Sequence, residues 1–145
     1  MSAASTRHTG WHPIPVGLKV LPFVMALWAI GSAANFSNLM TGGLPFFGTK
    51  LYGMSAVPVV LFFDFVGPLI FLVGLWNRAP WAPKWAAVYI GLFVLNGLVT
   101  LVTFAGEFGV APILAPCAVN LAILAVILWK RDYFAAHQGG AGVNV

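Results

Sequence analysis

The sequence predicts an all-α membrane protein, with four transmembrane helices in an antiparallel bundle and residues 1–145 forming a single domain. Composition is the first reason: 61% of the residues are hydrophobic and only 7% are charged, against about a quarter charged in a soluble domain. A soluble fold of this length cannot keep so many apolar side chains from water. The second reason is that the few charges separate four long apolar stretches.

The limits of the spans follow from the distances between charged residues. Thirty uncharged residues separate Lys19 from Lys50, and the next 27, up to Arg78, contain one charge. Twenty-two uncharged residues lie on each side of Glu107, close to the ~20 that a helix needs to cross ~30 Å of hydrocarbon. We therefore predict helices near residues 16–38, 55–76, 85–106 and 110–129, with short flexible tails.

The basic residues predict the orientation of the bundle. Six of the seven fall on one predicted side and Lys50 falls alone on the other, so the positive-inside rule places both termini in the cytoplasm. Interfacial aromatic residues gather on the same side, namely Trp76, Trp81, Trp85, Trp129 and Tyr133. The net charge of +4 forms no basic patch, which favours the lipid bilayer over a nucleic acid as partner. We expect a multi-pass protein of the bacterial cytoplasmic membrane.

The first span has an alternative interpretation. Arg7 and Lys19 precede an apolar run at residues 20–31 and then small residues at 32–34, an order that is also typical of a cleaved signal peptide. We favour a retained helix, because it gives an even number of spans and keeps the charge asymmetry consistent.

Asp64 is the charged residue that falls inside a predicted span, near its middle. A carboxylate in hydrocarbon is costly unless it is paired or faces a cavity, which makes this residue a candidate for binding a proton, a cation, water or a polar substrate. Pro68 lacks the N–H that bonds the carbonyl four residues earlier, so we expect the Asp64 carbonyl to be free. Gly67 and Gly74 lie near the same face and predict close approach of another helix.

Polar residues of the other spans are expected to share this interior. At 100° per residue, Asn96 lies on one face with Thr100 and Tyr89, and we expect Asn120 at the depth of Asp64. The candidates for binding or proton transfer are Asp64, Asn96, Asn120, Thr100 and Asn35, and those for lining a pocket are Trp28, Tyr89 and Cys117. We predict an interior that is polar from the outer surface to the middle and apolar beyond it. Packing is the other interpretation of the Asn and Thr residues and of the lone cysteine.

No residue pattern indicates soluble-type catalysis or a metal centre. His8, His12 and His137 all lie in the tails, so the sequence contains no intramembrane histidine pair for haem. It contains no GxSxG, HExxH or phosphate-binding glycine loop either. The cofactor is therefore unknown, with a quinone left open, and the protein is expected to lack a catalytic set of its own.

The stretch from Asp64 to Arg78 resembles the second helix of DoxX-like membrane proteins, in which an acidic residue precedes a glycine, a leucine-rich run, Gly-Leu and a basic turn. The four spans and the glycine-containing first helix are also similar. The resemblance implies a small four-helix subunit, linked in several members to membrane redox complexes such as thiosulfate:quinone oxidoreductase. The acid here is aspartate where the family usually has glutamate, and the end of the first span lacks the family's lysine.

Three functions are compatible with these features. The first is a non-catalytic or accessory subunit that packs its small and polar faces against another copy, as a homo-oligomer, or against a larger membrane complex. The second is a small carrier or proton-linked transporter with a midplane polar site around Asp64. The third is a quinone- or lipid-binding protein. A packed interior favours the first function, whereas a cavity that reaches Asp64 from the outer surface favours binding or transport.

Overall fold

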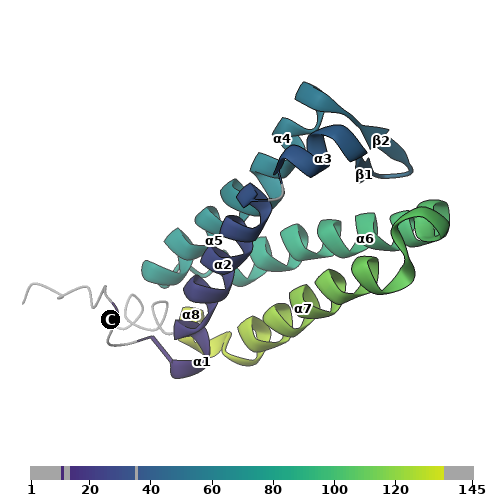
Figure 1. Ribbon diagram of the computed structural model, residues 1–145. Coiled ribbons are helices and arrows are strands. Elements are labelled where there is room, and N and C mark those ends of the chain that lie inside the picture. The colour runs from purple at the N-terminus through teal and green to yellow at the C-terminus, as the bar shows by residue number, and fades with distance from the viewer. Residues whose placement is uncertain (1–10, 12–13, 35, 136–145) are drawn as a thin grey trace, which may run out of the picture.

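The computed structural model describes residue 11, residues 14–34 and residues 36–135, apart from the side chains of residues 39 and 40. Four helical segments in it are long and apolar enough to cross a membrane. They are Val16–Ala34, Gly53–Trp76, Ala82–Phe108 and Val110–Trp129. The four predicted helices are confirmed, with differences of a few residues at the ends, and they pack together as one bundle (Figure 1).

Two of the spans are interrupted. The first consists of α1 (Val16–Lys19) and α2 (Leu21–Ala34), and α3 (Phe36–Gly42) comes after it and ends beyond the predicted limit at residue 38. The second consists of η1 (Gly53–Ser55), α4 (Val57–Leu61), η2 (Phe62–Val66) and α5 (Gly67–Trp76), of which η2 is a π-helical turn. Turns of this kind widen a helix locally and are frequent at functional sites.

The last two spans form a continuous antiparallel pair. They are α6 (Ala82–Phe108) and α7 (Val110–Trp129), joined by the single residue Gly109, whose φ of 82° suits glycine. The short helix α8 (Asp132–Ala135) follows and lies beside α1 (Figure 1). We call this the α1–α8 end of the bundle. Toward the opposite end, α2 and α4 diverge from α6 and α7 (Figure 1).

A β-hairpin lies at the opposite end, which we call the hairpin end. Strands β1 (Leu44–Phe46) and β2 (Thr49–Leu51) pair antiparallel. The two residues between them, Phe47 and Gly48, have φ values of 43° and 84°, the positive values that a tight type I′ hairpin turn requires. The sequence predicts only an outer loop in this region, so the hairpin is a finding of the structure.

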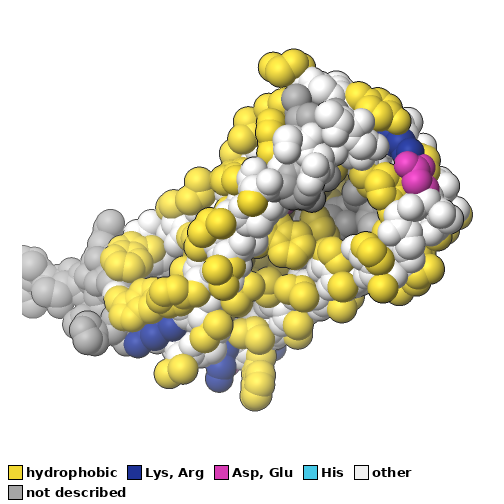
Figure 2. Space-filling view, in the orientation of Figure 1, with side chains coloured by type: hydrophobic (Ala, Val, Ile, Leu, Met, Phe, Trp, Pro, Cys, Tyr) yellow, Lys and Arg dark blue, Asp and Glu magenta, His cyan; other side chains and the backbone are white. Residues whose placement is uncertain are grey.

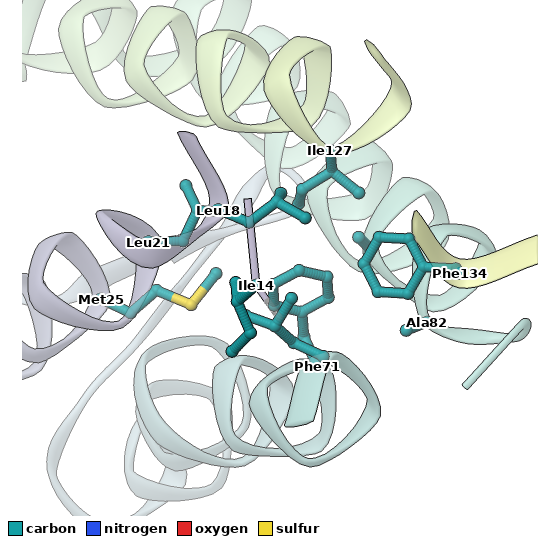
Figure 3. Close-up of a cluster of buried hydrophobic side chains, with 10 residues drawn as sticks. Ile14, Leu18, Leu21, Met25, Phe71, Ala82, Ile127 and Phe134 are labelled. Carbon is teal, nitrogen blue, oxygen red and sulfur yellow. The ribbon is translucent and has the colours of Figure 1, made fainter. Parts of the chain in front are cut away.

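Buried apolar side chains fill the α1–α8 end (Figure 3). The cluster draws on all four spans and α8. Its members are Ile14, Leu18, Leu21, Met25, Phe71, Leu75, Ala82, Ala86, Ile127 and Phe134. The apolar closure predicted on this side is therefore confirmed.

The outer surface of the bundle is also apolar. Large hydrophobic side chains cover much of the face seen in Figure 2, and Val102 on α6 is 87% exposed. A continuous apolar surface of this extent needs a lipid or protein environment, in keeping with four helices that are long and apolar enough to cross a membrane.

Candidate functional site: a cavity that reaches Asp64

A cavity of about 440 Å³ lies in the hairpin half of the bundle, within the range of ~300–1,000 Å³ typical of small-molecule sites. Its walls come from α2, the hairpin, the second span, α6 and α7, and Figure 2 shows the molecule hollowed between the hairpin end and the α6–α7 pair. On α6 the lining residues extend from Phe93 to Phe108, about 22 Å at 1.5 Å per residue. The cavity therefore runs from the hairpin to the middle of the bundle.

Asp64 forms part of the wall near the middle of the bundle. It lies in the π-helical turn η2 and is half-buried. The indole Nε1–H of Trp28 on α2 donates a hydrogen bond of 2.8 Å to Asp64 Oδ1, and Ser32, one turn along α2, also lines the cavity. Among the described residues, no lysine, arginine or histidine lines this cavity or forms an ion pair with Asp64.

The π-helical turn explains which backbone carbonyl Pro68 leaves free. The Gly67 N–H bonds the Phe62 carbonyl, five residues earlier, and in this register Pro68 would have bonded Phe63. The Tyr89 hydroxyl donates a hydrogen bond of 2.6 Å to the Phe63 carbonyl instead. We predicted a free carbonyl at Asp64, but the carbonyl that Pro68 leaves free, and that Tyr89 bonds, is that of Phe63. It lies one residue earlier because the helix changes from an α to a π register at this point.

Helix α6 approaches the second span closely at two glycines, as predicted. A Cβ added to Gly67 would lie 2.5 Å from Tyr89 Cδ2, and one added to Gly74 would lie 2.7 Å from Ala82 Cβ. Trp85 Nε1 also donates a hydrogen bond of 3.0 Å to the Gly67 carbonyl. These contacts fix η2, and with it Asp64, against α6.

Asn96 and Thr100 both line the cavity, but their hydrogen bonding differs. Asn96 Oδ1 accepts a hydrogen bond of 2.7 Å from the Phe47 N–H, and its Nδ2 donates one of 3.3 Å to the Pro45 carbonyl. Asn96 thus holds the hairpin over the cavity. Thr100 is 3% exposed, and its enclosed hydroxyl has no hydrogen-bond partner among the described residues.

The other candidate residues have separate places. Asn120 is buried, donates to the Pro116 carbonyl of its own helix at 3.0 Å, and lines a distinct cavity of about 20 Å³ with Tyr89. Trp28 lines both cavities. Cys117 lines the larger one, where its sulfur contacts Gly97. Asn35 lies outside the described residues.

The cavity is less polar than predicted. Aromatic rings make up the wall beside Asp64: the centroids of Phe63 and Phe93 are 6.0 Å apart, as are those of Trp28 and Phe93. Phe63 and Phe93 were not predicted as site residues, because apolar residues carry little information in an apolar span. Their positions in the sequence could have identified them, since Phe63 is next to Asp64 and Phe93 lies one turn before Asn96.

An ion pair fastens the hairpin to the end of α6. Lys50 Nζ on β2 pairs with the Glu107 carboxylate and lies 5.3 Å from the ring centroids of Phe104 and Phe108. The side chain of Glu107 is 51% exposed. Its partner on the hairpin was not predicted.

The fold and the cavity define a class: a small four-helix protein with the span lengths of a multi-pass membrane protein, packed at one end and hollow at the other. Within the described part of the chain, no three His, Cys, Asp or Glu side chains gather as metal ligands. Comparisons with protein families, curated proteins and solved structures found no match. The functional argument therefore rests on the geometry of the cavity.

Proposed function

We propose that this is a multi-pass protein of the bacterial cytoplasmic membrane, with both termini in the cytoplasm, that binds a small lipophilic ligand in the cavity at Asp64 and acts as a carrier. The observation that supports it is a ligand-sized cavity reaching Asp64 in a bundle whose other half is filled. Polar sites near the midplane are where carriers bind their substrates. The carboxylate orients the ligand, and the apolar walls contact its body.

The test is a cavity-filling substitution with a matched control. Val59 lines the cavity, whereas Val88 on α6 is 60% exposed. We expect 4-phenylbutylamine or 4-phenylbutanol to raise the melting temperature of the wild-type protein in mild detergent and of Val88→Phe, but not of Val59→Phe. If neither probe stabilises the wild type, or if Val59→Phe responds as the wild type does, the cavity is not a ligand site.

We propose the accessory-subunit role as the second candidate. Gly31 on α2 and Gly91 on α6 are exposed, and a Cβ added at either would meet no atom within 4 Å. Uncovered glycines on membrane helices allow another helix to approach closely, from a second copy or from a larger complex. The DoxX-like resemblance favours a membrane redox enzyme as that complex.

Crosslinking in native membranes tests this second candidate. We expect a crosslinked species larger than the monomer, which Gly31→Leu or Gly91→Leu diminishes because the bulkier side chain keeps the partner helix away. A protein that stays monomeric in native membranes and in mild detergent would contradict it.

A further inference from the structure

The polar groups around Asp64 mainly accept hydrogen bonds, so they suit a ligand that donates them. An ionised carboxylate has about four acceptor positions, and the bond from Trp28 uses one of them. The described wall contains no basic side chain that would supply further donors. Of the side-chain donors around the cavity, the Thr100 hydroxyl is left without a partner in the described part of the chain.

The charge of Asp64 is also left without a counter-ion among the described residues. A buried charge without a partner is strongly unfavourable, and it is relieved either by a proton or by an opposite charge. The side chains next to it on the cavity wall are the rings of Trp28, Phe63 and Phe93. Aromatic faces attract organic cations through their quadrupoles, so the wall suits a positive charge that carries apolar groups.

We propose that the ligand is a lipophilic organic ammonium ion that takes Asp64 as its counter-ion in exchange for a proton. This inference rests on the proposed function, that the cavity binds a ligand. One proton leaves the carboxyl group for solvent as one cation enters, so the net charge of the site is unchanged. The apolar body of the ligand extends toward the hairpin along α6.

The remaining groups of the site agree with this assignment. Thr100 lies seven residues beyond Phe93 on α6, about 10 Å toward the hairpin, and its hydroxyl oxygen is enclosed by the protein. The other titratable groups near Asp64 are Tyr89, whose hydroxyl is bonded to the Phe63 carbonyl, and Cys117 on the α7 wall. Neither supplies a positive charge, and Asp64 is the carboxylate of the described wall.

An oxidised quinone fits these groups less well. Its oxygen atoms only accept hydrogen bonds, and it carries no positive charge to balance a carboxylate. With a quinone bound, Asp64 would keep its charge unpaired. The donor and acceptor pattern therefore favours a cation over a quinone at this site.

The experiment measures probe binding by calorimetry on the purified full-length protein in mild detergent. Three probes share a phenylbutyl body and differ in their polar group, and the fourth is a quinone. The probes are 4-phenylbutylamine, 4-phenylbutyltrimethylammonium, the neutral 4-phenylbutanol, and decylubiquinone. We expect the wild type to bind both cations at least about tenfold more tightly than the alcohol, a difference of about 1.4 kcal/mol. Titrations in buffers of different ionisation heat should show up to one proton released per cation at low pH and none at high pH.

Three variants make the result specific. Asp64→Asn should bind amine and alcohol equally, with no proton release, whereas Asp64→Glu should keep the preference for cations. Asp132→Asn removes a carboxylate on α8, away from the cavity, and should behave as the wild type. Retained binding by Asp64→Glu shows that the site tolerates substitution at this position, so a loss in Asp64→Asn reports the charge.

The outcomes separate this inference from the proposed function. If the alcohol binds as tightly as the cations and Val59→Phe abolishes both, the cavity is a ligand site but the cation inference is wrong. Tighter binding of decylubiquinone than of either cation also overturns it. If no probe binds, both proposals fail.

Discussion

The hairpin depends on one side chain of α6, which leads to a prediction for Asn96→Ala. The substitution removes the hydrogen bonds that Asn96 makes with the Phe47 N–H, at 2.7 Å, and with the Pro45 carbonyl, at 3.3 Å. Each is worth about 1 kcal/mol net. Phe47 has a φ of 43°, a left-handed conformation that costs ~1–3 kcal/mol for a residue other than glycine. The hairpin of the variant has to maintain that conformation without the bond from Asn96.

We therefore expect Asn96→Ala to lower the free energy of local hairpin opening by about 2 kcal/mol, which is about a 30-fold increase in opening. Hydrogen exchange of residues 44–51, measured by mass spectrometry in mild detergent, reports this quantity directly. Exchange in the α6–α7 pair, away from the hairpin, should stay as in the wild type.

Thr103→Ala is the matched control on the same helix. Its hydroxyl donates to the Val99 carbonyl of α6 itself and does not contact the hairpin through a hydrogen bond, so exchange in residues 44–51 should change by less than about twofold, in line with the small effect of an exposed substitution. Equal hairpin exchange in Asn96→Ala and Thr103→Ala would refute the reasoning, because the Asn96 side chain would then not hold the hairpin.

Further predictions concern the contacts of α6 and the ion pair, each measured as unfolding in detergent. Gly74→Ala should destabilise the protein by about 1–3 kcal/mol through overpacking, whereas Gly91→Ala, in open space, should be neutral or slightly stabilising; equal effects would contradict the packing argument. Tyr89→Phe leaves a carbonyl of η2 without its partner and should cost about 1–3 kcal/mol; an unchanged stability would show that the tyrosine hydroxyl is dispensable. Lys50→Met breaks the pair with the half-exposed Glu107 and should cost at most about 1 kcal/mol, less at high salt; a larger effect, insensitive to salt, would be inconsistent with a surface pair.

The four spans were predictable because they depend on composition alone. Uncharged stretches of about 22 residues have the length of a membrane-crossing helix whatever their neighbours are, and the ends of α7 match the prediction to the residue. The hairpin was not predictable in this way. Phe47 is a poor residue for a left-handed turn position, and the side chain that bonds its N–H is 49 residues away in the sequence. No local pattern reports such a contact.

The π-helical turn is another feature that depends on distant residues. Pro68 signals that the helix lacks one hydrogen bond, but the sequence does not specify an α or a π register. The register is π where Tyr89 and Trp85, both from α6, bond the carbonyls of Phe63 and Gly67. Helix periodicity correctly placed Tyr89 on the interior face of its span. It did not predict the hydrogen-bond partner of the Tyr89 hydroxyl, which is the Phe63 carbonyl of the second span.

The candidate site was predictable at Asp64, because a carboxylate in an apolar span is informative by itself. Asn96 and Asn120 were expected beside it on the same reasoning. In the structure, Asn96 bonds the hairpin and Asn120 bonds its own helix. A hydrophilic side chain in a membrane helix is thus more ambiguous than a charge, since it has backbone partners within reach.

The polar groups of the hairpin half are of two kinds. Some have hydrogen-bond partners within the protein, and others lack a counter-ion or a hydrogen-bond partner among the described residues. Asn96 and Tyr89 bond carbonyl or N–H groups of the chain. Among the described residues, the charge of Asp64 has no counter-ion and the hydroxyl of Thr100 has no partner. Both residues line the same cavity. Because an unpaired charge is costly in an apolar environment, the position of Asp64 on the wall of a cavity is better explained by a ligand than by packing, and its charge is the feature that most restricts what the ligand is.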